Sequence, residues 1–359
     1  MAQTLVKFLG YSLHLVILYY GTLRLLSELG YLPTGLFLGL GLIAVVHYFR
    51  IPAPSQKDVE AILGKDLSDL SPEEMKTAKF VEVVGHRGGG IDAPENTIAA
   101  YKNCKENNCN YIEFDVCVTA DNVPVVFHDR TTGRLAEKNL EISKTNWATL
   151  KKLNLSAKHP NRERFPRTTI STLDETVSHL LSAGQKMFID VKHKDPRLIK
   201  VILDIYEKYP QLYTNALVTS FFATMIYRIR RRNPRIVAAV AWCPEVIYYA
   251  SKVSSEGGPW YAKLILRVLD VIHEWLLPRF TYFLVGFSVL LLHRYSMNVK
   301  TIYDWKQRGV RVIAWTLNRS LDKKYCVEVL KIPYLTDTFE DDPSKPPVHT
   351  DVPKEYYSY

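Results

Sequence analysis

Two carboxylates stand two residues apart in a short apolar segment of this 359-residue sequence. Residues 111–117 (YIEFDVC) have the pattern of a β-strand, so Glu113 and Asp115 point to the same side of it. Asp190 lies in a similar segment, 187–191. Like charges on one side of a buried strand repel each other unless a cation lies between them. Because three acidic oxygen donors suit a hard divalent ion, we predict that these three residues bind one Mg²⁺ or Ca²⁺ ion.

Two histidines follow two further apolar segments. His86 comes directly after residues 81–85, and His128 comes directly after residues 124–127. A lone histidine is most often a packing residue, but two imidazoles that titrate near neutrality can donate and accept protons on opposite sides of a scissile bond. We therefore predict that His86 and His128 are a catalytic acid and base, without assigning which is which.

Two basic side chains adjoin these groups in the sequence. Arg87 follows His86 and offers a planar fork to a phosphate group, and Lys192 follows Asp190 by two residues and offers a point charge. Cleavage of a phosphodiester requires a cation, an acid–base pair and positive charge for the phosphate oxygens. We predict that Arg87 and Lys192 bind phosphate.

The elements that must position these side chains alternate between strand-like and helix-like patterns from residue 80 onwards. Repeated short apolar runs with amphipathic stretches between them predict a parallel sheet with helices outside it. The expected strands are 81–85, 111–117, 124–127, 187–191, 216–220, 236–241, 282–286, 311–316 and 333–336. The expected helices are 95–107, 172–184, 195–209, 222–232, 298–309 and 321–330.

This α/β pattern has the size of a TIM (β/α)₈ barrel, which we assign to residues 80–342. In such a barrel the active site lies at the carboxyl ends of the strands, where the polar residues named above are found. The sequence has nine candidate strands, whereas the barrel has eight strands. Segments 111–117 and 124–127 are too close for a crossover helix, so we expect one of them to be an extension of the barrel.

The first 50 residues differ from the rest of the chain. Residues 5–26 and 31–49 are apolar runs of about 20 residues, the length that a hydrocarbon core requires. We predict a membrane anchor of one or two spans over residues 1–50, and hence an integral protein of an endomembrane or the plasma membrane. The side on which the catalytic part lies is left open. Residues 51–79 read as a linker with a short helix.

Residues 258–280 form a second apolar segment, in which charged residues recur at helical spacing. We predict an amphipathic helix that either packs on the barrel or dips into the bilayer surface, and both alternatives stay open. The tail 343–359 is rich in proline and is predicted to be disordered.

The overall charge favours an anionic partner. The chain has 46 basic and 37 acidic residues, a formal net charge of +9. Phospholipid headgroups and phosphorylated substrates suit this balance. No RNA- or DNA-binding motif accompanies it, so nucleic acid is not an expected partner. The sequon Asn154-Leu-Ser156 reads as a surface loop, and its glycosylation matters only if this part of the chain faces a lumen.

A series of motifs resembles the glycerophosphodiester phosphodiesterase family, and most of all its membrane-bound animal branch. The motifs are His86-Arg87-Gly88-Gly89, Ala93-Pro94-Glu95-Asn96-Thr97, Glu113-Phe114-Asp115-Val116, Val125-Val126-Phe127-His128-Asp129, Ile170-Ser171-Thr172-Leu173, Trp315-Thr316-Leu317-Asn318 and Leu335-Thr336-Asp337. Their order and spacing make the resemblance specific, and it covers about residues 80–342.

The resemblance implies a metal-dependent TIM barrel that hydrolyses glycerophosphodiesters to sn-glycerol 3-phosphate and an alcohol. The implied substrates are water-soluble glycerophospho-inositol, -choline or -ethanolamine, or glycerophospho-N-acylethanolamine. It also implies that Glu95 and Asn96 brace the first loop, with Glu95 reaching the metal or the substrate glycerol. Trp315 and Asn318 are expected to contact substrate. Asp190 stands where the wider family usually has Glu.

Two alternatives remain beside this interpretation. One is a lysophospholipase D that releases lysophosphatidate from lysophospholipids, which the apolar segments favour. The other is a catalytically dead membrane scaffold, which the presence of both histidines, the three acids and Arg87 disfavours.

Overall fold

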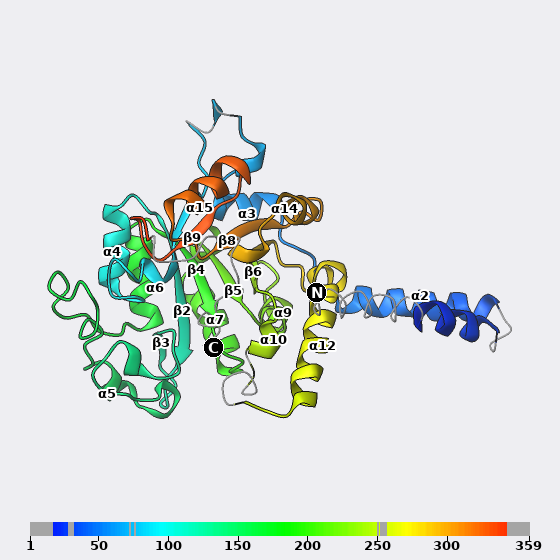
Figure 1. Ribbon diagram of the computed structural model, residues 1–359, viewed down its shortest axis with the longest axis horizontal. Coiled ribbons are helices and arrows are strands. Elements are labelled where there is room, and N and C mark those ends of the chain that lie inside the picture. Colours follow the sequence, from blue (N-terminus) through cyan, green and yellow to red (C-terminus); the bar gives the residue numbers. More distant parts are fainter. Residues whose placement is uncertain are drawn as a thin grey trace. The chain divides into compact units, whose positions relative to one another are not determined.

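The computed structural model describes residues 17–27, 32–71, 73–74, 77–249, 251 and 257–342 (Figure 1). The chain divides into two compact units. The smaller unit contains the described parts of residues 1–52 and 245–286, and the larger contains those of residues 53–244 and 287–342.

Within the described residues, the larger unit is built on a closed barrel of eight parallel strands. They are β1 (Val83–Gly85), β2 (Tyr111–Val118), β4 (Lys186–Val191), β5 (Ala216–Ser220), β6 (Ala238–Trp242), β7 (Val289–His293), β8 (Arg311–Trp315) and β9 (Tyr334–Thr336). β1 pairs with both β2 and β9 and so closes the ring. The predicted barrel fold is confirmed.

The two neighbouring strand candidates have different roles. β2 lies in the ring, between β1 and β4. β3 (Pro124–Val126) pairs antiparallel with the end of β2 and lies outside the ring. The expectation that one of the two segments is an extension is therefore correct.

The strand expected at residues 282–286 was wrong. This segment is the helix α13 (Tyr282–Val285), which ends at Gly286 with a left-handed φ of 66°. The sixth barrel strand is β7, a few residues later, whose five residues are all buried. Both segments are short apolar runs, which periodicity alone cannot assign to helix or strand. The left-handed glycine marks the end of a helix.

Helices of the larger unit surround the strands of the barrel (Figure 1). They include α4 (Ile98–Glu106), α5 (Trp147–Leu150), α6 (Leu173–Ser182), α7 (Arg197–Lys208), α8 (Leu212–Asn215), α9 (Ala223–Arg232), α14 (Val299–Lys306) and α15 (Ser320–Lys324). Thr172 begins α6 with a capping box to Glu175, which satisfies two backbone donors at that end. Gly184 and Gly309 follow α6 and α14 with positive φ, as expected for residues that end helices.

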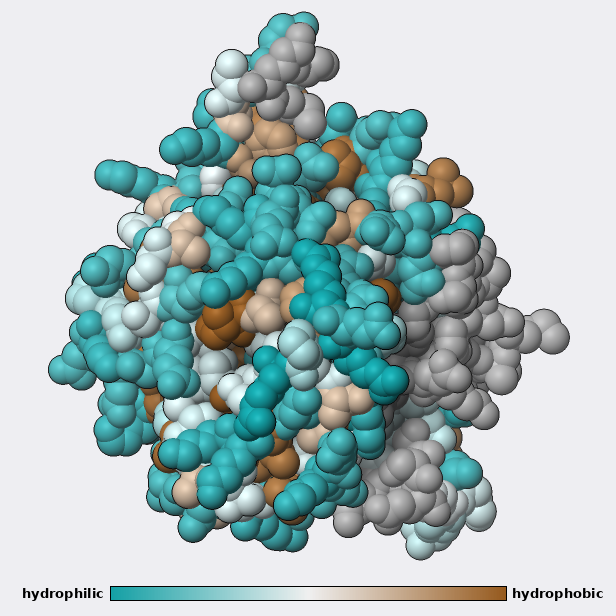
Figure 2. All heavy atoms as spheres, turned by 90° about the vertical axis from the view of Figure 1, so that its left-hand side faces the viewer, coloured by the Kyte–Doolittle hydropathy of each residue, from teal (hydrophilic) through white to brown (hydrophobic). Residues whose placement is uncertain are grey.

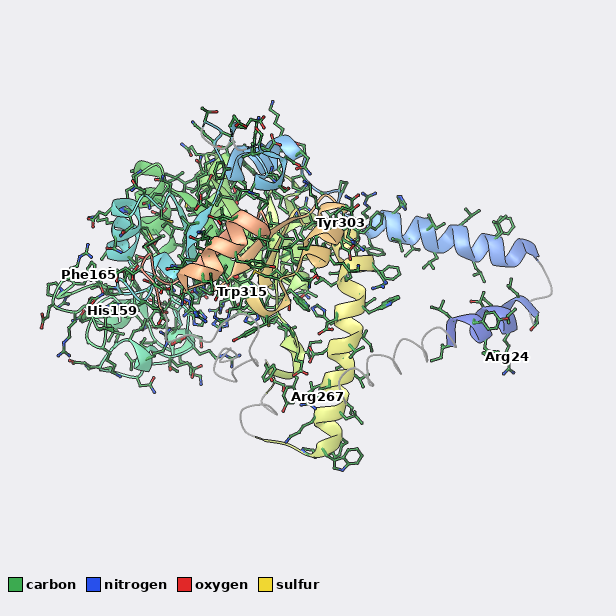
Figure 3. The ribbon with its side chains drawn as sticks, turned by 45° about the horizontal axis from the view of Figure 1, so that its top comes forward. Arg24, His159, Phe165, Arg267, Tyr303 and Trp315 are labelled. Carbon is green, nitrogen blue, oxygen red and sulfur yellow. The ribbon has the colours of Figure 1, made fainter. Side chains whose placement is uncertain are left out.

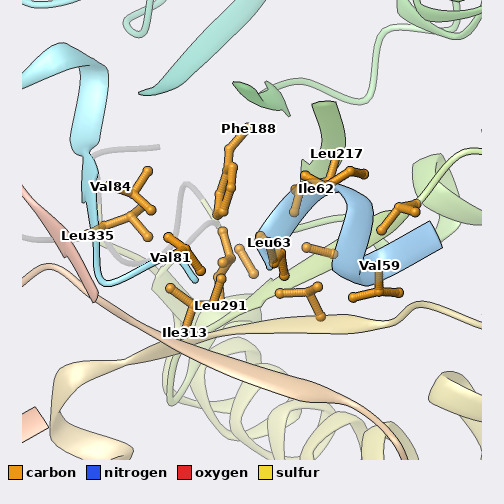
Figure 4. Close-up of a cluster of buried hydrophobic side chains, with 14 residues drawn as sticks. Val59, Ile62, Leu63, Val81, Val84, Phe188, Leu217, Leu291, Ile313 and Leu335 are labelled. Atoms are coloured by element: carbon orange, nitrogen blue, oxygen red, sulfur yellow. The ribbon is translucent and has the colours of Figure 1, made fainter. Parts of the chain in front are cut away.

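The short helix expected between residues 51 and 79 is α3 (Gln56–Leu63), and its apolar face belongs to the barrel core. Val59, Ile62 and Leu63 are at most 1% exposed and pack with side chains from the barrel interior (Figure 4). Arg311, the first residue of β8, donates a hydrogen bond of 2.6 Å to the Gly64 carbonyl. α3 therefore lies at the amino ends of the strands, which leaves the carboxyl ends for chemistry.

The outer surface of the barrel on the side of α4, α5 and α6 is largely hydrophilic, with apolar residues scattered in small groups (Figure 2). This is the usual surface of a water-exposed α/β domain.

The smaller unit consists of helices. Residues 17–27 are helical, and α2 (Leu32–Phe49), α10 (Val246–Tyr249), α12 (Trp260–Leu276), a π-helical turn at Leu277–Thr281 and α13 follow. Among the described residues, no helix combines the length and the apolar character that a membrane span needs. The anchor over residues 1–50 stays a prediction. Residues 1–16 and 28–31 of it, and the tail 343–359, lie outside the described residues.

Candidate active site

The first loop of the barrel turns sharply after β1. Arg87, Gly88 and Gly89 all have positive φ. A Cβ atom at Gly88 would lie 2.8 Å from that of Ala100, so only glycine fits against α4 there. The turn directs the backbone N–H of Arg87 to Glu113 Oε2, at 2.9 Å.

Glu113, Asp115 and Asp190 converge as predicted. β2 and β4 run in parallel with Asp115 directly opposite Asp190. The three residues each offer a carboxylate oxygen, and these atoms all lie within 4.8 Å of one another. Each residue is at most 5% exposed. Asp115 Oδ1 and Asp190 Oδ1 are buried without a hydrogen-bond partner. Buried carboxylate oxygens that protein donors leave unsatisfied fit a hard divalent cation, so the donor set suits Mg²⁺ or Ca²⁺.

The electrostatics of this triad depend on its burial. Burial and the charges of Asp115 and Asp190 raise the pKa of Glu113 well above its usual value. Burial raises the pKa of Asp190 to about 7, and Asp115 adds to this although Lys192 opposes it. Burial also disfavours ionised Asp115, but protonated His128, Lys192 and Arg87 together hold its pKa below the usual range. A bound cation would remove the repulsion that raises these values.

His86 lies between two carboxylates. Its Nδ1 is 2.5 Å from Asp337 Oδ1, and its Nε2 is 3.9 Å from Glu113 Oε2. Asp337 follows β9 and accepts a hydrogen bond of 2.9 Å from Asn318 Nδ2. Asn318 Oδ1 in turn accepts from the Asp337 backbone N–H. The proton of Nδ1 is therefore held by Asp337, and Nε2 faces the acidic triad.

His128 is oriented in a similar way by the residue that follows it. Its Nδ1 is 2.6 Å from Asp129 Oδ1. Burial and the positive charges of Arg87 and Lys192 lower the pKa of His128 to about 4, although Asp115 and Asp129 oppose this. A neutral imidazole at pH 7 can accept a proton from a substrate.

Glu95 is held by two guanidinium groups. Arg134 donates two hydrogen bonds of 2.7 Å to its oxygens, and Arg87 Nη1 donates one of 3.2 Å. Arg134 also donates to Asp129 at 2.7 Å and so connects Glu95 with the partner of His128. Asn96 donates a hydrogen bond of 2.9 Å to Asp115 Oδ2. The roles of Glu95 and Asn96 in supporting the first loop stay predictions.

Lys192 and Trp315 both lie beside the ring of Phe221. Lys192 Nζ is 3.5 Å from Asp115 Oδ1 and 3.7 Å from Asp190 Oδ2. Trp315 is half-buried, with its ring centroid 5.4 Å from that of Phe221 and its Nε1 donating to the Leu291 carbonyl. Lys192 thus adjoins both the acids and the aromatic pair, because its Nζ also lies 5.5 Å from the ring centroid of Phe221. Their roles in binding substrate stay predictions.

Asn154 lies away from these residues, in the loop before α6. Its amide Oδ1 accepts hydrogen bonds from the backbone N–H groups of Ser156 and Thr168, and its Nδ2 donates to the Pro166 carbonyl. This amide supports the loop, and glycosylation of Asn154 stays a prediction.

Three residues of the site were not assigned a role from the sequence: Asp129, Asp337 and Arg134. Each histidine proves to have its own carboxylate partner. Asp129 could have been found as the residue next to His128, since a carboxylate beside an imidazole commonly orients it. Asp337 could be found only by closing the barrel, which brings β9 beside β1.

Comparisons with known proteins agree with this geometry. Residues 86–341 match the model of the Glycerophosphoryl diester phosphodiesterase family. The chain belongs to this family. It is 28% identical to mouse Glycerophosphodiester phosphodiesterase 1, over 84% of this chain and 87% of that protein. It is 23% identical to mouse Lysophospholipase D GDPD3, over 67% of this chain and 74% of that protein. The predicted family and class of enzyme are thereby confirmed.

Solved structures support the fold. A phosphodiesterase from Oleispira antarctica, solved in complex with the product sn-glycerol-3-phosphate, has a TM-score of 0.54 at 24% identity. The match covers 71% of this chain and 92% of that one. A glycerophosphoryl diester phosphodiesterase from Silicibacter pomeroyi has the same TM-score at 19% identity, covering 72% of this chain and 90% of that one.

Proposed function

We propose that this family member hydrolyses glycerophosphodiesters to sn-glycerol 3-phosphate and an alcohol in a reaction that depends on a divalent cation. The observation that carries the proposal is the convergence of the acidic triad with His86, whose Nε2 lies 3.9 Å from Glu113. Water-soluble glycerophospho-inositol, -choline and -ethanolamine and glycerophospho-N-acylethanolamine are the proposed substrates.

In the proposed mechanism Glu113, Asp115 and Asp190 hold the cation, which when bound stabilises negative charge on the phosphate oxygens. The guanidinium of Arg87 binds a further phosphate oxygen. One imidazole removes the proton of the glycerol 2-hydroxyl, whose oxygen attacks phosphorus. The other imidazole protonates the departing alcohol, so a cyclic 1,2-phosphate forms and water then opens it. Direct attack by water is the rival route.

A panel of diesters tests this proposal. The purified full chain is incubated with each substrate in Mg²⁺, in Ca²⁺ or with a chelator, and glycerol 3-phosphate is measured. We expect turnover that the chelator abolishes and that Asp190→Asn reduces strongly. Asp204→Asn, an exposed carboxylate on α7 that pairs with Lys200, is the matched control. Turnover that survives the chelator would contradict the cation requirement, and no turnover of any diester would support a dead scaffold.

A second candidate is a lysophospholipase D. It is favoured by the exposed apolar side chains of the smaller unit, among them Phe37 and Leu42 of α2, because they suit a protein that takes its substrate from a membrane. The same panel, extended with lysophosphatidylcholine, separates the two activities. Release of lysophosphatidate without release of glycerol 3-phosphate would replace the first proposal by the second.

We further propose that residues 1–50 anchor the chain in an endomembrane or the plasma membrane. Large apolar side chains are exposed along residues 17–27 and along α2, which supports the anchor. Retention of the full chain in a carbonate-washed membrane fraction is the expected result, and release by carbonate would contradict it.

A further inference from the structure

The helix α12 carries an apolar face that the proposed chemistry does not use. Large apolar side chains along its 17 residues are between 42% and 75% exposed. They are Trp260, Tyr261, Leu264, Ile265, Val268, Leu269 and Ile272. At about 100° per residue, these positions fall within one half of the helix circumference. We call this set the α12 apolar face.

The other side of α12 already has its packing partner. Asp270 is 3% exposed and accepts hydrogen bonds of 2.7 and 2.9 Å from the backbone N–H groups of Ile247 and Tyr248 in α10. The Arg267 guanidinium lies 5.2 Å from the ring centroid of Tyr248. Figure 3 labels Arg267 on this helix. These contacts fix the rotation of α12 about its axis, so exposure of the apolar face follows from how the helix is docked on α10.

The charges beside the α12 apolar face are mostly basic. Lys263 and Arg267 are exposed, whereas Asp270 is buried and Glu274 is half-buried. Arg267 borders the face and Lys263 lies farther round the helix, and an exposed apolar face with basic side chains near it suits the boundary between acyl chains and anionic headgroups. Trp260 and Tyr261 begin the helix, and such rings are enriched at that boundary.

The charges of α12 suit a position along the membrane rather than across it. Three ionisable residues, Asp270, His273 and Glu274, interrupt the second half of its 17 residues, and such groups are costly in a hydrocarbon core. The helix is also part of the same unit as α2: Ile51, just after α2, donates a hydrogen bond of 2.9 Å to the Leu284 carbonyl of α13.

We propose that α12 lies in the plane of a membrane, with the α12 apolar face among the acyl chains and with Lys263 and Arg267 at anionic headgroups. The inference goes beyond the proposed activity and holds whether or not the chain cleaves glycerophosphodiesters. It decides between the two alternatives that the sequence left open for residues 258–280, in favour of lipid.

A local probe tests the proposal, because the N-terminal segment alone could keep the chain on a membrane. The full chain is reconstituted in vesicles of phosphatidylcholine and phosphatidylserine. Its five native cysteines are at most 3% exposed, so a fluorophore can be attached selectively to an introduced, exposed cysteine. The labelled variant is Ile265→Cys. The matched control is Leu321→Cys, a 69% exposed apolar position on α15 of the barrel.

We expect the label at position 265 to be shielded from aqueous iodide and quenched by nitroxides on the acyl chains, and the label at 321 to show neither effect. Shielding at 265 without quenching by lipid would mean that protein covers the face, and free access of iodide would mean that nothing does. Either result overturns the proposal. A label at Lys263→Cys should stay accessible to iodide. If the labels at positions 263 and 265 were equally buried among the acyl chains, the helix would span the membrane, and this result would also overturn the proposal.

The basic side chains of Lys263 and Arg267 give a second test. Lys263→Glu/Arg267→Glu should reduce the lipid quenching of the label at position 265 in vesicles that contain phosphatidylserine, while leaving the weaker quenching in pure phosphatidylcholine unchanged. Equal quenching of this variant and its parent in both vesicles would contradict the role of anionic headgroups. Turnover of a water-soluble diester, measured on the same samples, reports independently on the proposed activity.

Discussion

His86 and Asp337 are joined by a hydrogen bond of 2.5 Å between Nδ1 and Oδ1, although 251 residues separate them in the chain. The pairing of β1 with β9 brings them together, and Asn318 holds the second oxygen of Asp337 at 2.9 Å. Burial disfavours ionised Asp337, but its contacts with His86 and Asn318 and the charge of Arg87 hold its pKa below the usual range. Asp337 therefore stays a hydrogen-bond acceptor for Nδ1 over the working range of pH and leaves Nε2 for chemistry.

Replacing Asp337 by Asn should reduce kcat by ~10²–10⁴, the usual contribution of a positioned acid or base. The amide keeps the shape of the carboxylate, but its N–H₂ group would face Nδ1 and favour the wrong tautomer of His86. We expect KM to change little, because Asp337 is proposed to position His86 rather than to bind substrate. Steady-state kinetics against pH test this, with Asp204→Asn as the control. A kcat within twofold of the parent would remove Asp337 from the scheme.

Arg134→Lys should lower kcat/KM by about tenfold. Arg134 bridges Glu95 and Asp129 with three hydrogen bonds of 2.7 Å, and a lysine cannot reproduce that fork. The side chains of Glu95, in the first loop, and of Asp129, which orients His128, would then no longer be held by the same guanidinium group. Arg164→Lys is the matched control, because Arg164 pairs with Glu106 on the exposed surface, where an ion pair contributes little. Equal losses for the two variants would show that the Arg134 fork has no special role.

Much of the site could be predicted from the sequence because its acids follow a local rule. Side chains two apart on a strand share a side, which placed Glu113 with Asp115. Parallel strands meet at one end of the barrel, which placed Asp190 near them. Neither step needs knowledge of distant contacts. The register between two strands does depend on distant contacts. The direct pairing of Asp115 with Asp190 is therefore known only from the structure.

The features that sequence reasoning missed depend on contacts between distant segments. Nothing local distinguishes Asp337 from a surface residue after a short strand, and its role follows from closure of the ring. The error at residues 282–286 has the same origin. An apolar run of four or five residues fits a helix or a strand equally well, and packing in the smaller unit made this one helical. Residues 51–79 also read as a linker because only the folded barrel reveals a core for Ile62 and Leu63.

Without a cation, Asp190 and Glu113 should lower the melting temperature of the protein as the pH rises from 6.5 to 8, above the range in which His128, with its lowered pKa, has the opposite effect. The pKa of Asp190 is about 7 in the folded chain, against an ordinary value of 3.8, and that of Glu113 is also raised. Between these values the folded state binds more protons than the unfolded state, so the free energy of unfolding decreases with pH, by roughly 1 kcal/mol per pH unit for each such group.

Saturating Mg²⁺ or Ca²⁺ should flatten this dependence, because a bound cation replaces the protons on the acidic triad. The apparent cation affinity should weaken below about pH 7 for the same reason. Thermal unfolding of the purified chain at four pH values, with cation or chelator, measures both effects. Asp190→Asn should reduce the slope measured in chelator. Identical slopes with and without cation would mean that the triad does not bind one.

A diester whose glycerol lacks the 2-hydroxyl should be turned over at least ~10²-fold more slowly, because the proposed nucleophile is part of the substrate and gains the advantage of an intramolecular attack. A diester whose glycerol lacks its free terminal hydroxyl is the matched control, since it keeps the nucleophile and loses a similar polar group. ³¹P NMR should detect the cyclic 1,2-phosphate early in the reaction of the intact substrate. Normal turnover of the 2-deoxy diester would exclude the cyclic route and leave water as the attacking group. One of His86 and His128 would then remove a proton from that water, and the other would protonate the departing alcohol. Proton transfer on the two sides of phosphorus is required in either route.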